Sequence, residues 1–163
     1  MARLRIIIDT REQSPWAFDP AAVEAEIGTL KTADYALEGD DAFGIERKSM
    51  DDFLGTISSG WERFEREIER MAGWVAKLII VEGDYATCCF SQTLDGELEP
   101  PSHRHYMLTP QFVEKRIAQL SMRGVSVLFA TDCHLAAGLA TALFRERQYQ
   151  LNEIQKTNES SKN

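Results

Sequence analysis

Residues 43–48 read Phe43-Gly44-Ile45-Glu46-Arg47-Lys48, and we predict that they form the strand around which the fold assembles. Successive side chains of a strand point to opposite faces, so Glu46 and Lys48 share one face while Ile45 and Arg47 share the other. The spacing therefore places a carboxylate beside an amine on one strand face. This Glu-x-Lys pair is the first candidate for chemistry in the chain.

A hairpin is predicted to bring a second carboxylate to this pair. Asp34 lies twelve residues before Glu46, and residues 38–42 have the composition of a turn. If residues 38–42 form the loop, Asp34 falls directly opposite Glu46, and opposed residues point to one face with Cβ atoms about 4.5–5.5 Å apart. Ala36 and Gly44 on that face are small enough to leave the carboxylates accessible. The opposite face is expected to be core and carries Tyr35, Leu37, Phe43 and Ile45.

Two carboxylates this close favour a bound cation. Like charges repel, so such pairs are usually separated, protonated or bridged by a positive ion. Mg²⁺ typically takes one or two carboxylates and fills its remaining positions with water and substrate phosphate. The pair Asp34 and Glu46 therefore predicts a Mg²⁺ site, at which Mn²⁺ is expected to substitute.

The motif around these residues resembles the nuclease domain of the XPF/Mus family of structure-specific DNA endonucleases. That family's signature reads Gly-Asp, a variable gap and Glu-Arg-Lys-x-x-x-Asp, and the family has the PD-(D/E)xK nuclease fold. The resemblance runs with decreasing strength from residue 4 to about 147 and is closest to compact bacterial or phage members. Its segments are Ile6-Ile7-Ile8-Asp9-Thr10-Arg11-Glu12, Ala33-Asp34-Tyr35 and Ile45-Glu46-Arg47-Lys48-Ser49, followed by Asp52. Ala33 departs from the family, which has Gly at this position.

The resemblance implies a divalent-metal-dependent DNA endonuclease with a restriction-endonuclease-like core. It implies that Asp9, Asp34 and Glu46 hold the metal, which polarises the scissile phosphate and lowers the pKa of a bound water. Lys48 would then orient or deprotonate that water and offset charge in the transition state. These four residues are the candidate catalytic set.

Supporting roles fall to four neighbours of the catalytic set, namely Arg11, Glu12, Arg47 and Asp52. Ordinary explanations compete with some of these assignments. Asp9 and Glu12 follow a buried strand, and both can be ordinary polar residues of a surface loop without a catalytic role. Ser49 and Asp52 have the form of a capping box, with Ser49 at the helix N-cap, so capping is the favoured role for Asp52.

A helix from Trp61 is predicted to carry Arg63, Arg66 and Arg70 on one stripe. Glutamates interleave with these arginines at helical spacing, so a solvated face of ion pairs explains the stripe as well as DNA contact does. In the resembling family the corresponding helix borders the active site. We therefore name these three arginines as candidate phosphate contacts.

The overall pattern predicts an α/β fold with a mixed central sheet flanked by helices. Buried strands are expected at 4–8, 77–82 and 125–130. Helix starts are expected at Ser49, Trp61, Thr109 and Asp132.

The two ends of the chain carry weaker patterns. Asp19-Pro20 has the form of a helix start, and Val23 and Ile27 recur at helical spacing, so a helix to about residue 30 is expected. Residues 1–147 are assigned to one nuclease domain. Residues 148–163, where hydrophobic residues thin out, are expected to form a frayed tail.

Residues 84–109 are the least readable part of the chain. A structureless loop of this length is uncommon in a compact domain unless it is functional or disordered. His103 and His105 lie there, but no third ligand follows at a recognisable spacing, so a plain loop is favoured over a metal site. Arg104 between them is a further candidate DNA contact.

The composition describes one acidic chain of 163 residues with a formal net charge of −8 and a pI near 4.9. This acidity argues against a general nucleic-acid binder, but net charge is a sum, whereas binding depends on where the charges lie. No apolar run of membrane-spanning length and no signal peptide is seen. Three cysteines form no framework, so we expect free thiols and a reducing compartment. The resemblance to compact bacterial or phage members implies the cytoplasm of a bacterium or a phage-infected host cell.

The leading hypothesis is an endonuclease that hydrolyses phosphodiester bonds of DNA, at branched or flapped sites as the family does. A rival from another class is a catalytically silent subunit or interaction module of the same fold, although such subunits usually lose motif carboxylates that are present here. A second rival, an acidic DNA mimic, leaves the Glu-x-Lys strand unexplained.

Two kinds of protein partner are expected. The family dimerises through its nuclease domain, and residues 135–144 hold more apolar positions than one buried helical stripe needs, so a homodimer through the last two helices and residues 125–130 is predicted. Family nucleases commonly grip duplex DNA through paired helix-hairpin-helix motifs, for which this sequence leaves no room. We therefore expect weak, salt-dependent DNA binding and a partner that targets the protein to DNA.

Overall fold

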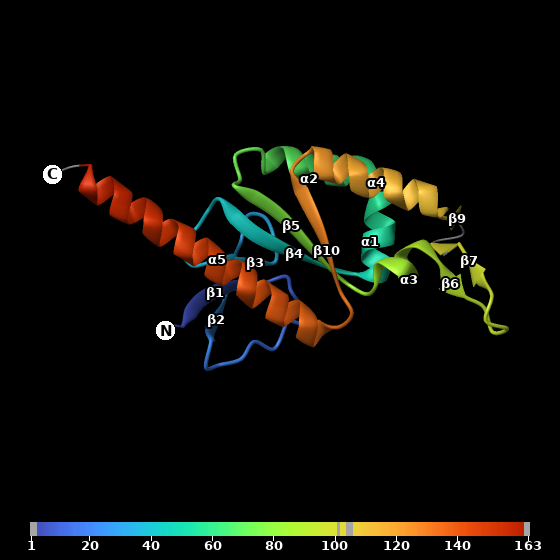
Figure 1. Ribbon diagram of the computed structural model, residues 1–163, viewed down its shortest axis with the longest axis horizontal. Coiled ribbons are helices and arrows are strands. Elements are labelled where there is room, and N and C mark those ends of the chain that lie inside the picture. Colours follow the sequence, from blue (N-terminus) through green and yellow to red (C-terminus); the bar gives the residue numbers. More distant parts are fainter. Residues whose placement is uncertain (1–2, 101, 104–105, 162–163) are drawn as a thin grey trace.

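The computed structural model describes residues 3–100, 102–103 and 106–161, and its centre is a mixed six-stranded sheet (Figure 1). The strand order is β10-β5-β4-β3-β1-β2. The strands are β1 (Leu4–Asp9), β2 (Val23–Gly28), β3 (Tyr35–Leu37), β4 (Phe43–Ser49), β5 (Ala76–Glu82) and β10 (Val125–Ala130). Strands β4, β5 and β10 are parallel, β1 and β2 are parallel, and β3 is antiparallel to both of its neighbours. The predicted α/β fold with a mixed sheet is confirmed.

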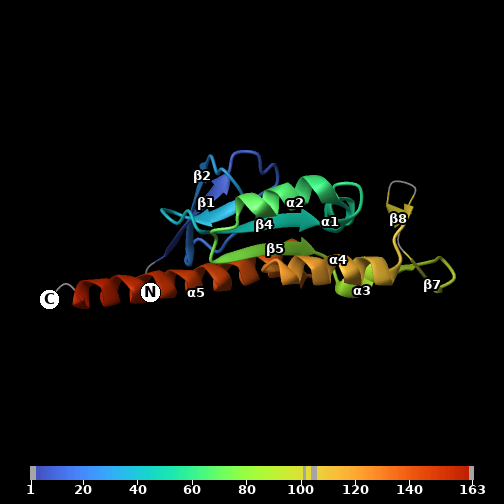
Figure 2. The same cartoon turned by 90° about the horizontal axis from the view of Figure 1, so that it is seen from above.

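Helices cover both faces of this sheet (Figure 2). They are α1 (Met50–Ile57), α2 (Trp61–Arg70), α4 (Pro110–Met122) and α5 (Cys133–Ser160). One hydrophobic cluster joins α5 to β1, β3, β4 and β5, and a second joins α1, α2 and α4 to β5 and β10. Ser49, Thr109 and Asp132 cap α1, α4 and α5 with their side chains, as the sequence predicts.

The predicted helix over residues 20–30 is wrong, because this segment contains β2. Asp19 does start a turn, since its carbonyl accepts hydrogen bonds from the amides of Ala22 and Val23. The chain then becomes extended and pairs in parallel with β1, with Val23 beside Leu4. Pairing satisfies the backbone groups of β1, whereas Ile27, assigned to the buried helical stripe, is 74% exposed.

Helix α5 contacts the sheet through alanines. Ala136, Ala137, Ala140 and Phe144 are buried, whereas Leu135 is 58% exposed. Small side chains let a helix backbone approach the strands closely. The spacing of the leucines predicts a leucine-lined buried face, so the alanine face was not identified from the sequence. The helix also continues to Ser160, with residues 152–160 exposed, where the sequence led us to expect a frayed tail.

A buried ion pair ties α5 to the hairpin loop. Arg147 Nε lies 2.6 Å from Asp40 Oδ2, and the two side chains are 7% and 4% exposed. Asp40 belongs to the loop between β3 and β4, 107 residues earlier in the chain. Burial disfavours the charged form of Asp40, but its hydrogen bonds with Arg147 outweigh this and lower its pKa.

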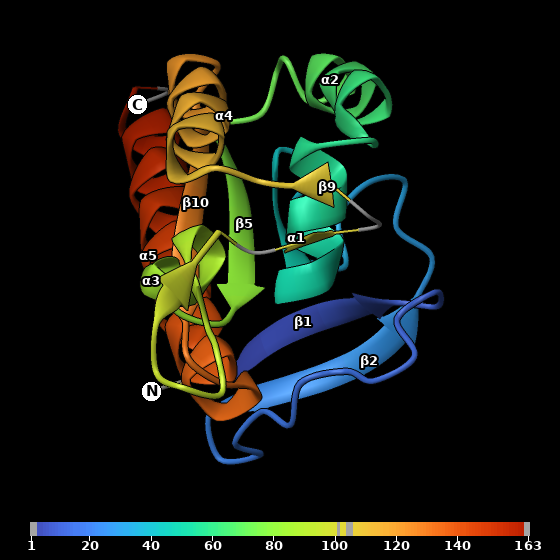
Figure 3. The ribbon, with the colours of Figure 1, turned by 90° about the vertical axis from the view of Figure 1, so that its right-hand side faces the viewer.

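The segment after β5 forms a short helix and two small ribbons at the end of the molecule opposite the C-terminus (Figure 1), and Figure 3 views the molecule from this end. Its elements are α3 (Tyr85–Cys89), β6 (Ser91–Gln92), β7 (Leu98–Glu99), β8 (Ser102–His103) and β9 (Tyr106–Met107). The predictions for Arg104 and His105 lie outside the described residues. All three cysteines are free thiols, as expected. Within the described ranges, the structure contains no helix that is both long and apolar enough to cross a membrane.

Candidate active site

The hairpin of β3 and β4 brings the predicted carboxylates together. Residues 38–42 form its loop, and Tyr35 pairs with Ile45, which is the predicted register. Beyond this pair the Asp34 amide donates to the Ile45 carbonyl at 3.1 Å, and the side chains of Asp34 and Glu46 line the same hollow. The other face of the hairpin is core, as predicted, with Tyr35 and Ile45 fully buried.

Asp34 and Glu46 influence each other electrostatically. Burial, and then the charge of Glu46, raise the pKa of Asp34 to about 7, although the Arg47 amide donates to Asp34 Oδ2 at 2.8 Å. Lys48 Nζ lies 2.9 Å from Glu46 Oε1 on the same strand face. Three of the four predicted catalytic residues therefore meet at one place, and their chemistry is that of a carboxylate pair with an adjacent amine.

This carboxylate pair fits a hard divalent cation. Asp34 resists ionisation because it is partly buried beside a second carboxylate, and a cation between them would relieve that repulsion. Mg²⁺ commonly uses only one or two protein carboxylates. Within the described part of the chain, no three histidine, cysteine, aspartate or glutamate side chains are arranged to hold a metal by themselves. A metal held here would therefore rely on Asp34 and Glu46 alone among the described carboxylates of the centre.

The small residues beside the pair do not leave open space, contrary to our expectation. A Cβ atom at Gly44 would lie 2.8 Å from the Ala33 Cβ and 3.0 Å from the Trp74 ring, so these side chains cover Gly44. Ala36 is also buried. Ala33 has a φ of 71°, a left-handed conformation that glycine adopts without strain. This backbone conformation gives a physical reason for a glycine in the family signature.

The Asp9 carboxylate links the segment after β1 to the segment after β2 through hydrogen bonds. Its Oδ1 accepts from the amide and the Nε of Arg11, at 2.9 and 2.5 Å, and its Oδ2 accepts from the Leu30 amide at 2.7 Å. Arg11 Nη2 also donates to the Leu30 carbonyl. Burial disfavours the charged Asp9, but these hydrogen bonds outweigh it and lower its pKa. Both oxygens are engaged, so the role of Asp9 as a metal ligand stays a prediction.

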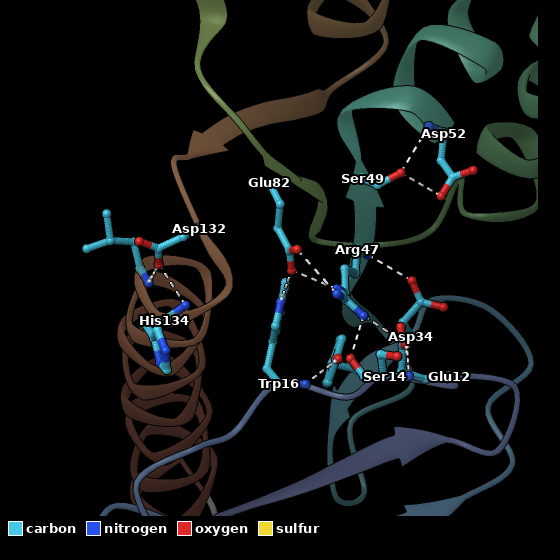
Figure 4. Close-up of polar contacts among 12 residues, drawn as sticks. Glu12, Ser14, Trp16, Asp34, Arg47, Ser49, Asp52, Glu82, Asp132 and His134 are labelled. Carbon is cyan, nitrogen blue, oxygen red and sulfur yellow. Dashed lines mark hydrogen bonds and ion pairs between the residues drawn. The ribbon is translucent and has the colours of Figure 1, made fainter. Parts of the chain in front are cut away.

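The Arg47 side chain bonds both to Glu82 and to the segment that carries Glu12 and Ser14 (Figure 4). Its Nε lies 2.7 Å from Glu82 Oε1, and its Nη1 lies 3.0 Å from Glu12 Oε1 and also donates to the Ser14 carbonyl. Trp16 Nε1 donates to the same Glu82 oxygen at 2.5 Å. The hydrogen bond with Glu82 raises the pKa of Arg47. These bonds fix the 12–16 loop against β4 and β5.

Glu82 is a site-supporting residue that we did not identify from the sequence. It ends the apolar run of β5, as Asp9 ends that of β1, so a carboxylate closing a buried strand was the available signal. Burial of Glu82 is outweighed by hydrogen bonds from Arg47 and Trp16, which lower its pKa. The backbone amide of Arg47 in turn holds Asp34, so this network reaches the candidate centre.

Asp52 sits in the capping box at the start of α1 (Figure 4). The Ser49 hydroxyl accepts from the Asp52 amide at 3.1 Å and donates to Asp52 Oδ2 at 2.8 Å. This geometry accounts for Asp52 by helix capping, the explanation that the sequence favoured. Asp52 also borders a hollow beside Lys48.

Two hollows lie at the candidate centre, one beside the carboxylate pair and one beside Lys48. The carboxylate pocket has a volume of about 220 Å³ and is lined by Arg11, Lys31, Asp34, Glu46, Glu67 and Arg70, among others. The turn pocket has a volume of about 360 Å³ and is lined by residues that include Lys48, Asp52, Ser59, Gly60 and Arg63. Helix α2 therefore contributes one predicted arginine to each pocket.

The arginines of α2 also form ion pairs, as the alternative explanation required. Arg63 and Arg70 lie 4.0 and 3.9 Å from Glu67, and both arginine side chains are more than 60% exposed. Exposed pairs of this length contribute little energy, so both guanidinium groups remain accessible to another anion. Arg66 is exposed and lines neither pocket.

Comparisons with known proteins identify the family of the chain and agree with its fold. A family model described as the ERCC4 domain matches residues 8–143. The solved structure of XPF from Aeropyrum pernix matches with a TM-score of 0.65 and 22% sequence identity, covering 93% of this chain and 69% of that one. XPF from Aeropyrum pernix in complex with DNA matches with a TM-score of 0.65 and 24% identity, covering 91% and 66%. Among curated protein sequences, none matches this chain.

Proposed function

This chain belongs to the ERCC4 domain family, and on that basis we propose that it is a divalent-metal-dependent endonuclease acting on branched or flapped DNA. The observation that carries the proposal is the meeting of Asp34, Glu46 and Lys48 on one face of the β3–β4 hairpin. A carboxylate pair with an adjacent amine is what metal-assisted phosphodiester hydrolysis needs. The fold shared with archaeal XPF supports the same reading.

Each residue of the centre would have its own task. Asp34 and Glu46 would hold Mg²⁺ or Mn²⁺, which when bound supplies Lewis-acid activation of the phosphate and a more acidic water. Lys48, partly buried and paired with Glu46, would hold the attacking water or offset charge that develops on the phosphate oxygens. Arg47 would hold Asp34 in place through its backbone amide and, through its side chain, fix the neighbouring loop.

The test is incubation of the purified protein with end-labelled flap, fork, four-way junction and linear duplex DNAs, with Mg²⁺, with Mn²⁺ and with EDTA. We expect metal-dependent incision that is faster on branched substrates than on the linear duplex. Intact DNA in every reaction would favour the silent interaction module instead. Equal cleavage in EDTA would exclude the metal-dependent mechanism.

We expect DNA binding by this protein alone to be weak and strongly salt-dependent. The pockets and α2 offer few cations to phosphate, and about four contacts would make log K fall with log salt at a slope near −3.6. Raising the salt from about 50 to 200 mM should then weaken binding by roughly two orders of magnitude. Fluorescence anisotropy on a branched DNA, with Ca²⁺ replacing Mg²⁺ to suppress cleavage, measures this slope. Tight binding that hardly changes over this range would show that the grip is not electrostatic.

We also propose a homodimer that uses α5 and β10. Leu135 is 58% exposed, and β10 is an edge strand with Val127, Leu128 and Phe129 only partly buried. Light scattering at tens of micromolar protein should give about twice the 18.5 kDa mass of one chain. Leu135→Glu should shift the mass towards the monomer, because it places a charge in the apolar interface.

The matched control for the dimer is Ile27→Glu. Ile27 is also apolar and exposed, but it lies on β2 at the opposite edge of the sheet. This variant should keep the dimer mass. A monomeric parent protein, or equal loss of the dimer in both variants, would contradict the proposed interface.

A further inference from the structure

Lys31 is a cation at the candidate active site that the sequence motif does not include. It lies in the loop between β2 and β3 and lines the carboxylate pocket together with Asp34 and Glu46. Two other cations line this pocket, but Arg11 is bound to Asp9 and Arg70 lies near Glu67. Among the ion pairs of the described residues, none involves Lys31. Lys31 is exposed, so its ammonium is accessible to a ligand at this pocket.

The backbone on both sides of Lys31 is held in place. Immediately before it, the Leu30 amide donates to Asp9 Oδ2 and the Leu30 carbonyl accepts from Arg11. A few residues after it, the Asp34 amide donates to the Ile45 carbonyl, and the Asp34 carbonyl accepts from the Asp9 amide at 2.8 Å. Residues 31–33 therefore form a short span between two fixed points. Because the backbone is already ordered, a ligand that binds Lys31 has to order only the lysine side chain.

The charge balance of the carboxylate pocket favours an anionic ligand once a metal is present. Arg11, Lys31 and Arg70 face three carboxylates, those of Asp34, Glu46 and Glu67. A divalent cation on Asp34 and Glu46 would leave the pocket with an excess of positive charge. A lysine ammonium is a compact point charge that suits a phosphate oxygen.

The turn pocket borders Lys48, whereas the carboxylate pocket borders Asp34 and Glu46. Arg63 lines it and Arg70 lines the carboxylate pocket, and seven residues of helix separate the two by about 10 Å. Seven residues are close to two helical turns, so both arginines lie on the same side of α2. A single DNA strand following α2 would thus meet a cation on each side of the scissile phosphate.

We propose that Lys31 binds the backbone phosphate next to the scissile one, on the side of the carboxylate pocket, while Arg63 faces the strand on the other side. This inference rests on the proposed nuclease function and adds the residue that holds the strand in register. Its ligand is a phosphodiester of DNA. Lys31 is a substrate-binding residue in this scheme, not a member of the hydrolytic centre.

The test compares Lys31→Ala with Lys115→Ala, an identical change at an exposed lysine of α4. Binding is measured by anisotropy with Ca²⁺ on a branched DNA at several salt concentrations. Lys31→Ala should weaken binding about three- to tenfold and reduce the salt slope by about one, whereas Lys115→Ala should match the parent protein. With Mg²⁺, Lys31→Ala should raise KM more than it lowers kcat.

A second arm locates the contact. Single methylphosphonates, which remove the charge of one phosphate, are moved along the strand. One position adjacent to the incision site should weaken binding to the parent protein but not to Lys31→Ala, because the partner charge is already gone. Identical behaviour of Lys31→Ala and Lys115→Ala, or an unchanged methylphosphonate profile in Lys31→Ala, would overturn the proposal.

The two proposals can fail separately. A parent protein that binds DNA but never cuts it contradicts the nuclease function, while the binding arms still decide the role of Lys31. A protein that cuts DNA normally after Lys31→Ala, with unchanged KM and salt slope, contradicts only the role of Lys31. A parent protein that binds no branched DNA contradicts both.

Discussion

Glu46→Gln, Asp34→Asn and Lys48→Ala should each reduce the rate of DNA cleavage by about 10²–10⁴-fold. The two carboxamides keep the size of the side chain but remove the charge that would hold the cation, and Lys48→Ala removes the amine 2.9 Å from Glu46. The measurement is single-turnover cleavage of a labelled flap DNA with saturating Mg²⁺. A rate near that of the parent protein for any one variant would contradict the assignment of that residue.

The matched control for these variants is Glu26→Gln. Glu26 is an exposed carboxylate on β2 that pairs only loosely with Arg5, at 3.6 Å. The same chemical change should leave cleavage unaltered. Asp34, Glu46 and Lys48 are partly buried but belong to neither hydrophobic cluster, so thermal unfolding of all variants separates lost chemistry from lost structure.

Arg147→Met should destabilise the fold by about 3–5 kcal/mol, because it leaves the buried carboxylate of Asp40 without a partner. For a chain of this size that corresponds to a lower Tm by about 6–20 °C. Thermal and denaturant unfolding measure the effect. The double variant Asp40→Leu with Arg147→Met should regain much of the lost stability, since apolar replacements of buried ion pairs are often neutral or stabilising.

The control for this prediction is Arg145→Met, two residues earlier on the exposed side of α5. It should change the free energy of unfolding by no more than about 0.5 kcal/mol. If Arg147→Met were equally mild, the pair between α5 and the hairpin loop would contribute little to stability. Hydrolytic activity at a temperature well below the transition should survive Arg147→Met, because neither partner belongs to the centre.

The same pair predicts how stability depends on pH. The pKa of Asp40 is lowered in the folded protein, so its contribution is present above the pKa of the unfolded chain, near 3.8, and is lost as the pH falls through the folded value. The difference in unfolding free energy between the parent protein and Asp40→Asn should therefore be constant near neutral pH. It should shrink as the solution becomes more acidic than about pH 4.

The hairpin and its register could be predicted from sequence because local rules determine both. A turn composition over residues 38–42 fixes the loop, and the period of two then fixes which side chains share a face with Glu46. The starts of α1, α4 and α5 were equally local, since a capping side chain and the amides it binds lie within three residues. These features need no knowledge of the remaining fold.

The segment over residues 20–30 shows where such rules fail. Val23 and Ile27 satisfy a helical spacing and also an alternating one, so the sequence alone leaves the choice open. The segment is a strand because its backbone pairs in parallel with β1, whose outer edge would otherwise lack hydrogen-bond partners. Strand partners that lie about twenty residues apart cannot be read from a local pattern.

Side-chain partners distant in sequence were also beyond prediction. Asp40 was interpreted only as a turn residue, and its partner Arg147 was taken to end the domain. Asp9 was assigned to the metal because of its place in a motif, whereas its geometry depends on the backbone of Leu30. A motif indicates which residues gather at a site, but it does not say which atoms each of them contacts.

The position of β3 and β4 at the middle of the sheet has a consequence for hydrogen–deuterium exchange. Two strands lie outward of β4 and two lie outward of β3, so neither central strand can open unless its neighbours separate first. Opening free energies range from near zero in loops to the full unfolding free energy in such strands. The Glu46 amide should therefore exchange only on global unfolding. Local fluctuations would then leave the strand that carries Glu46 and Lys48 undisturbed, so the spacing of these two charged groups would persist for as long as the protein stays folded.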